Sequence, residues 1–274
     1  MRKKEIFNKI IKDIKKVKIQ GAKNIAKKAL YAYFLIPTKK SKKVLISTRP
    51  TEPMMKRVLE MAEKKEGSYQ KILKHFDLAQ KKINDYVFKI IKNNEIIFTH
   101  CHSTNVVQSL IYAKRKGKKF EIYNTETRPL FQGRKTAVEL KKAGIKVTMF
   151  VDSASALAIE KENNKDKIYS DKIFIGADAL LPNGIINKIG SNMIAELAKI
   201  HKIPFYIVAD SLKYTKEKIP IENRKLNEIW NSAPAKIKIK NPAFEFVPKK
   251  YITAIVSEHG ILKYENFVKK MMKE

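Results

Sequence analysis

The chain has little of several features that would settle its class at once. A single cysteine, Cys101, stands among 274 residues, which excludes an internal disulfide framework and favours a reducing, intracellular compartment. No apolar run approaches the roughly 20 residues that a membrane-spanning helix needs. The N-terminal run is basic but lacks the apolar core of a secretory signal. We therefore expect a cytoplasmic protein that is not bound to a membrane.

Acidic side chains are also scarce: 27 Asp and Glu stand against 58 Lys and Arg, for a formal net charge of +31. Such an excess attracts phosphate groups, whether on nucleic acid or on small metabolites. The lysines are spread along the whole chain, however, often in pairs on polar helix faces, which is typical of a solvated surface. Zinc-ligand spacing and RNA-binding motifs are missing. Nucleic-acid binding is therefore a secondary hypothesis, and we expect no metal site.

The pattern of apolar residues divides the chain in two. In residues 1–93 apolar side chains recur at spacings of three and four, which predicts a helical N-terminal domain interrupted by a loop with two prolines at 47–53. In residues 94–274 short apolar runs alternate with amphipathic segments, which predicts a Rossmann-like parallel sheet covered by helices on both faces. The expected strands cover 96–100, 120–126, 147–152, 172–178, 204–210 and 251–258, and one of the expected helices covers 155–163.

Polar residues follow the predicted strands. Cys101, Asp178 and Lys213 each come at or just after the end of an apolar run, and the carboxyl ends of parallel strands line the ligand crevice of such sheets. A helix starting near Ser103 would lower the pKa of the Cys101 thiol through its dipole. A buried structural cysteine is the competing interpretation. The neighbouring histidines, His100 and His102, either tune the thiol or are simply hydrogen-bonded.

Other residues are suited to an anionic ligand. Asn187 and Lys188 precede a predicted helix start at Ser191, where exposed N–H groups attract phosphate. Arg49 lies in the proline-containing loop and can bind an anion with two hydrogen bonds. Gly21 lies near a helix start, where backbone can approach a ligand closely. Each cation taken alone is typical of a solvated surface charge, and their common position at strand and helix ends favours a pocket.

Five segments together carry a family resemblance: "THCHS", "TETRPLFQG", "GADALLPNGIINKIG", "VADSLKY" and "NPAFEFVPKKYI". The chain resembles the sugar-phosphate isomerase family that also contains the regulatory subunits of translation initiation factor 2B. Within that family it is most similar to the archaeal members that act on ribose 1,5-bisphosphate. The resemblance implies conversion of this aldose to ribulose 1,5-bisphosphate, in AMP metabolism, without a cofactor. It also implies self-association as dimers or hexamers.

The resemblance assigns roles to particular residues. The catalytic positions fall on Cys101 and Asp178. The substrate-binding positions fall on Gln20, Gly21, Ala22, Lys23, Arg49, Asn187, Lys188 and Lys213. Gln20 departs from the family, which usually has an arginine there, and the nearby Lys23 is a candidate to replace its charge.

Two alternatives remain open. One is a methylthioribose-1-phosphate isomerase with the same chemistry on a monophosphate. The other is a non-catalytic regulatory subunit that binds initiation factor 2, close to RNA. That branch typically lacks the cysteine, so the presence of Cys101 together with Asp178 favours an enzyme.

Overall fold

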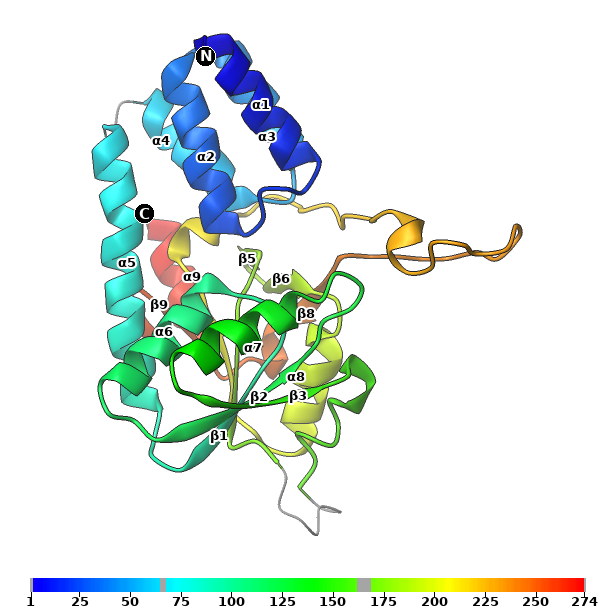
Figure 1. Ribbon diagram of the computed structural model, residues 1–274. Helices are drawn as coiled ribbons and strands as arrows, with labels where there is room; N and C mark the ends of the chain where they lie inside the picture. Colours follow the sequence, from blue (N-terminus) through cyan, green and yellow to red (C-terminus); the bar gives the residue numbers. More distant parts are fainter. Residues whose placement is uncertain (1, 65–67, 162–168, 274) are drawn as a thin grey trace.

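The computed structural model describes residues 2–64, 68–161 and 169–273. The N-terminal part is helical, as the apolar spacing predicts (Figure 1). Its helices are α1 (Lys3–Lys15), α2 (Ala22–Leu35), α3 (Lys39–Thr48), α4 (Pro53–Glu63) and α5 (Tyr69–Ile90). Side chains such as Ile14, Ile25, Leu30 and Leu59 are fully buried between them. The loop with two prolines separates α3 from α4, as predicted.

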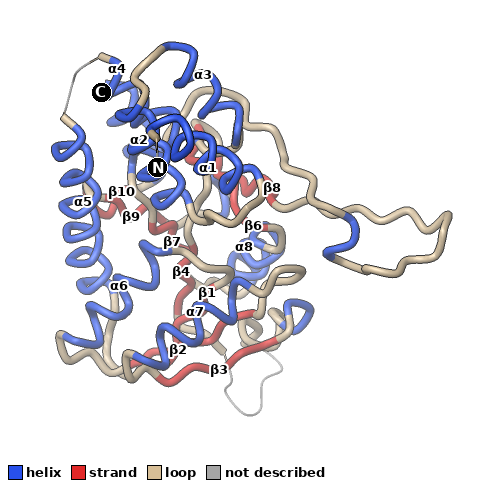
Figure 2. Tube along the Cα trace, turned by 45° about the horizontal axis from the view of Figure 1, so that its top comes forward, coloured by secondary structure: helices blue, strands red, loops and turns tan. Residues whose placement is uncertain are grey.

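Helix α5 connects the two halves of the molecule. Its first half supplies Ile72 and Phe76 to the core of the N-terminal helices. Its second half supplies Ile83 and Val87 to a different core, against the sheet, and both views show it running down along the flank of the sheet (Figures 1 and 2). The division into domains 1–93 and 94–274 stays a prediction, since α5 contributes to both cores. None of the described helices is long and apolar enough to cross a bilayer.

The predicted sheet is confirmed as a mostly parallel one within the described part of the chain. Its strand order is β10-β9-β7-β4-β1-β2-β3, and only the β9–β10 pair among these is antiparallel. The strands are β1 (Glu95–Thr99), β2 (Phe120–Thr125), β3 (Lys146–Phe150), β4 (Lys172–Ile175), β7 (Phe205–Val208), β9 (Ala254–Ser257) and β10 (Gly260–Leu262).

Helices cover both faces of this sheet. Along β1, Ile97 packs into the core that contains α5, α6 (Thr104–Arg115) and α7 (Gln132–Lys142). The next residue, Phe98, points to the opposite core, which contains α8 (Ser191–Ile200) and α9 (Tyr264–Lys273). Successive side chains of a strand face opposite sides, so strands buried on both faces become continuous apolar runs. This is the pattern that made the fold class predictable.

Three features differ from the sequence-based expectations. A second sheet, in the order β5-β6-β8, lies beside the first and is formed by β5 (Ala179–Leu181), β6 (Gly184–Lys188) and β8 (Phe244–Pro248). The helix predicted over 155–163 is wrong for residues 155–161: after the short 3₁₀ helix η1 (Asp152–Ala154), residues 155–159 form turns and 160–161 are irregular. Residues 162 and 163 lie outside the described residues. Finally, residues 216–243 form an extended arm that reaches away from the body (Figure 1).

Candidate active site

The backbone of Cys101 is held in an unusual conformation just after β1. Its φ is +66°, in the left-handed region, where a non-glycine residue costs on the order of 1–3 kcal/mol unless its surroundings hold it. Here they do: its N–H donates to Thr127 Oγ1 at 3.0 Å, and its carbonyl accepts from Thr136 Oγ1 at 2.9 Å. The strand end and two threonine hydroxyls thus fix the direction of the thiol.

The surroundings of the Cys101 thiol favour its protonated form. Burial raises the pKa of Cys101 to about 11, and the nearby Lys188 opposes this rise only in part. The helix begins at Thr104, as predicted, but the expected lowering of the thiol pKa is wrong, because burial outweighs the effects that oppose it. Ser103, the N-cap residue of α6, accepts a hydrogen bond from Val106 N–H with its own side chain, so this helix start is already capped.

The two neighbouring histidines have structural partners. His100 Nε2 donates to the Ile189 carbonyl at 2.9 Å, so its Nδ1 accepts from Thr125 Oγ1 at 2.6 Å. A Cβ on Gly190 would lie 3.3 Å from the His100 ring, so this contact requires a small residue there. Burial lowers the pKa of His102 to about 4, so its ring is neutral. Its Nδ1 donates a hydrogen bond to Thr136 Oγ1 at 3.1 Å. Through these hydrogen bonds both histidines stabilise the loop around Cys101.

Asp178 lies between β4 and β5, at the edge where the parallel strands end. Burial raises its pKa, although Lys213, Lys188 and Arg49 oppose that rise. A carboxyl group in this setting holds a proton at higher pH than usual and can act as a general acid. Its place at the end of a buried strand matches the sequence-based expectation.

A second buried carboxyl group, that of Glu52, was missed by sequence reasoning. Glu52 is the N-cap residue of α4, but its side chain makes no capping hydrogen bond. The residue is 4% exposed, and within the described residues its Oε2 has no hydrogen-bond partner. Burial, followed by the charge of Asp178, raises its pKa to about 8. The pocket therefore holds two carboxyl groups whose pKa is raised by burial.

The cations of the pocket are partly neutralised. Arg49 forms an ion pair with Glu222 from the arm at 2.9 Å, while its buried Nε has no partner among the described residues. Lys213, in the 3₁₀ helix η2 (Ser211–Lys213), donates to the Ala177 carbonyl at 2.5 Å. The ammonium of Lys188 lies over the Phe244 ring, 4.8 Å from its centre, and forms no ion pair with a described carboxylate.

The start of α8 is not open to a phosphate. Asn187 and Lys188 end β6, and the Asn187 amide donates to Ser191 Oγ. The Asn192 N–H donates to Glu245 Oε1 at 2.9 Å, and hydrogen bonds from the backbone at Gly190 and Ser191 also reach this carboxylate. The expectation that exposed N–H groups here bind an anion is therefore wrong, because Glu245 already occupies that position.

The start of α2 is different. Gly21 is its N-cap residue, with φ +83°, no side-chain cap and no acidic residue in the first turn, and the residues that open this helix line the cavity. Beside it, Gln20 donates to the Val17 carbonyl at 3.1 Å. Lys23 is directed toward the Phe76 carbonyl and Asp77, with its Nζ 3.5 Å from the carboxylate. Gln20 carries no charge and the charge of Lys23 is paired with Asp77, so neither side chain offers the pocket the unpaired positive charge of an arginine.

These residues surround one cavity of about 310 Å³ between the N-terminal helices and the ends of the strands. Every residue that the sequence singled out lines it: Gln20, Gly21, Ala22, Lys23, Arg49, Cys101, Asp178, Asn187, Lys188 and Lys213. Glu52, Gln132, Arg224 and Phe244 line it as well. A thiol, two carboxyl groups and several cations in one buried space can support proton transfer on an anionic ligand.

The comparison with known proteins agrees with this arrangement. The model of the initiation factor 2 subunit family matches residues 37–264. The chain belongs to this family, which confirms the resemblance drawn from the five segments. A Pyrococcus horikoshii OT3 structure of translation initiation factor eIF-2B superposes with a TM-score of 0.80 at 21% identity, covering 94% of this chain and 96% of that one. At that identity the likeness shows the fold alone.

Relatives named as enzymes are closer in sequence. The ribose 1,5-bisphosphate isomerase of Archaeoglobus fulgidus is 32% identical, over 92% of this chain and 88% of its own. The methylthioribose-1-phosphate isomerase of Thermosipho africanus is 31% identical, over 98% of this chain and 90% of its own. Isomerases of phosphorylated sugars are therefore among the similar proteins. Overall sequence identity does not distinguish between the two substrates that these relatives are named for.

Proposed function

We propose that the protein isomerises ribose 1,5-bisphosphate to ribulose 1,5-bisphosphate. The observation that carries this proposal is that Cys101 and Asp178 line the same cavity. The charge of Lys188 acts on both groups, opposing the rise in each pKa. A base and an acid facing one carbon–carbon unit are what an aldose-to-ketose conversion needs.

In the proposed mechanism the two groups share one proton, and the reactive form is a Cys101 thiolate beside a protonated Asp178. Asp178 gives its proton to the ring oxygen as the C1–O4 bond breaks, and Cys101 removes the proton from C2. The product of this step is an enol phosphate with a C1–C2 double bond. Asp178 then takes the proton of the C2 hydroxyl while Cys101 returns its proton to C1. This yields the ketose and restores both groups.

Two phosphates need two sets of donors. Lys188 and Lys213 support one set, because each lacks an ion-pair partner among the described carboxylates. The uncapped N–H groups of α2 near Gly21 support the other. The net charge of +31 favours the approach of a highly anionic substrate.

The test is direct turnover of ribose 1,5-bisphosphate, followed by appearance of the ketose. Cys101→Ser and Asp178→Asn are the two informative variants, since each keeps the size and polarity of its site. Gln108→Ala, on α6 and outside the residues that line the cavity, is a matched control that should keep full activity. Full activity in Cys101→Ser would overturn the proposed base.

One observation favours a second candidate, methylthioribose 1-phosphate. Glu52 is a buried acid at the end of the cavity where Arg49 is already neutralised by Glu222. A dianionic phosphate placed against Glu52 would require this carboxyl to stay protonated, whereas a neutral methylthio group can pack against it in either protonation state. The ratio of kcat/KM on the two substrates separates these candidates, and Glu52→Gln should shift the ratio toward the bisphosphate.

Self-association belongs to the same proposal. The extended arm exposes Ile221, Leu226, Ile229, Trp230 and Ile237, a concentration of apolar surface that favours contact with another protein. A second copy of the chain is the partner we propose, as a dimer or a larger assembly of dimers.

A further inference from the structure

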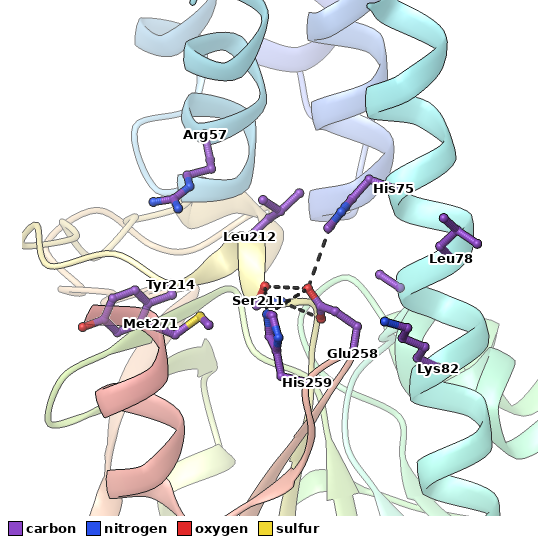
Figure 3. Close-up of a pocket in the computed structure, with 11 residues that line it drawn as sticks. Arg57, His75, Leu78, Lys82, Ser211, Leu212, Tyr214, Glu258, His259 and Met271 are labelled. Carbon is purple, nitrogen blue, oxygen red and sulfur yellow. Dashed lines mark hydrogen bonds and ion pairs between the residues drawn. The ribbon is translucent and has the colours of Figure 1, made fainter. Parts of the chain in front are cut away.

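A second cavity, of about 300 Å³, lies on the flank of α5 and is lined by residues different from those of the pocket described above. Figure 3 shows the polar side chains that gather in it: His75 from α5, Ser211 from η2, and Glu258 with His259 just after β9. Asp210, at the end of β7, lies next to this group. Three elements that are distant in the sequence therefore bring an imidazole and two carboxylates together.

The distances suit a common ligand better than direct hydrogen bonds. His75 Nε2 lies 3.7 Å from Asp210 Oδ1 and 3.9 Å from Glu258 Oε1, and one donor atom from each residue lies within 4.8 Å of the others. These separations are too long for hydrogen bonds, and His75 Nε2 is buried without a hydrogen-bond partner among the described residues. Ligand atoms around a tetrahedral Zn²⁺ are about 3.3–3.6 Å apart. The two distances from His75 Nε2 would therefore have to shorten by a few tenths of an ångström, and the distance between the two carboxylates by up to roughly 1 Å.

Both carboxylates are already oriented by other groups. Asp210 Oδ1 accepts from Leu212 N–H at 2.9 Å, and Ser211 donates to Glu258 through both its N–H, at 3.1 Å, and its hydroxyl, at 2.5 Å. Carboxylates that bind metals are commonly held by such outer hydrogen bonds. Asp210 and Glu258 are buried, and within 4 Å their described ion-pair partners are histidines and not lysines or arginines. Two neighbouring buried carboxylates without a fixed cation are costly unless a proton or a metal ion joins them.

We propose that His75, Asp210 and Glu258 bind one divalent transition-metal ion. An imidazole with two carboxylates suits Zn²⁺, Mn²⁺, Fe²⁺ or Co²⁺ better than Mg²⁺ or Ca²⁺, and the cavity leaves room for water at the remaining position. The side chain of His75 is 33% exposed, which gives the ion a path from solvent. The site stands apart from the sugar-phosphate pocket, so the proposed proton transfers take place without it.

The ion would join α5, η2 and the end of β9. Because η2 also carries Lys213, which lines the sugar-phosphate pocket, the ion would fix the segment that positions this cation. Metal binding is therefore expected to lower KM for a phosphorylated substrate with little change in kcat.

The experiment uses the full-length protein, stripped with a chelator and dialysed, and titrated with CoCl₂. We expect one Co²⁺ per chain, visible absorption of a low-coordinate ion, displacement by ZnCl₂, and a Tm several degrees higher with the ion bound. His75→Gln should abolish this binding. Ser211→Ala keeps all three ligands and removes an outer hydrogen bond, and it should weaken binding by roughly 10–100-fold.

The matched control is His201→Gln, which removes a histidine at the end of α8 and should bind Co²⁺ like the unmodified protein. Retention of binding in His75→Gln would overturn the proposal, since the ion would then be held elsewhere. Absence of stoichiometric Co²⁺ and Zn²⁺ binding to the unmodified protein would overturn it too, leaving His75 as an ion-pair partner of Asp210. None of these readouts depends on isomerase activity, so the two proposals fail separately.

Discussion

The hydroxyl oxygen of Thr127 accepts a hydrogen bond from the N–H of Cys101 at 3.0 Å, and both residues have left-handed backbone, with φ of +63° and +66°. Two adjacent strand ends, those of β1 and β2, thereby hold each other in conformations that neither would adopt alone. This pair of residues therefore fixes the direction of the Cys101 side chain.

Replacing Thr127 by Val should lower kcat by roughly 10–100-fold, because the buried N–H of Cys101 loses its acceptor, at a cost of about 1–3 kcal/mol. KM should change little. Thr127→Ser keeps the acceptor and should restore most of the rate. Steady-state kinetics on the three proteins test this, and a Val variant with normal kcat would show that the hydrogen bond does not position the thiol.

The pH dependence of kcat/KM follows from the two pKa values. Because Asp178 and Cys101 share one proton, the population of the reactive form is constant between their pKa values. It falls below the raised pKa of Asp178 and above the pKa of Cys101, about 11. We therefore expect a broad plateau that extends to strongly alkaline pH. In Glu52→Gln, where this neighbouring carboxyl cannot ionise near pH 8, a rate that already falls near pH 8 would contradict this assignment of the proton.

Glu52 should make the protein less stable as pH rises. Its pKa is about 8 in the folded state against an ordinary value of 4.5, so its contribution to stability is fully present below about pH 4.5 and is lost as pH rises through 8. Glu52→Gln cannot ionise and should remove roughly 3–5 kcal/mol of this pH dependence. Chemical denaturation at pH 5 and at pH 9 measures it. Equal pH dependence in both proteins would show that Glu52 is solvated.

The arm should govern the oligomeric state. Trp230 and Ile237 are 47% and 50% exposed on it, and the replacement of both by Ser should convert an oligomer to a single chain without unfolding the body. Light scattering coupled to size-exclusion chromatography gives the mass directly. A single chain for the unmodified protein would contradict self-association.

The main sheet and the candidate site could be predicted because they depend on local patterns. Strands buried on both faces give uninterrupted apolar runs, and the ends of parallel strands converge, so Cys101 and Asp178 could be placed at one edge from sequence alone. The start of α2 at Ala22 likewise follows from Gly21 and the apolar spacing after it.

What could not be predicted depends on contacts between distant segments. Strand β5 is only three residues long, and β6 pairs with β8 some sixty residues later, so the sequence around the turn at 182–183 does not by itself show that a second sheet forms. Glu245 caps α8 through the same long-range pairing. Glu52 resembles a solvated loop residue in the sequence, and it becomes buried only because the helices, the sheet and the arm close around it.

The decisive measurement is turnover of ribose 1,5-bisphosphate by the purified protein and by Cys101→Ser, with methylthioribose 1-phosphate as the comparison substrate. We expect the bisphosphate to be converted to its ketose, and the Ser variant to lose at least about 1,000-fold in kcat, since a serine hydroxyl is a far weaker acid than a thiol at this position. No conversion of either sugar by the unmodified protein, or an undiminished rate in Cys101→Ser, would contradict an isomerase built on this thiol, and the first result would favour a regulatory subunit.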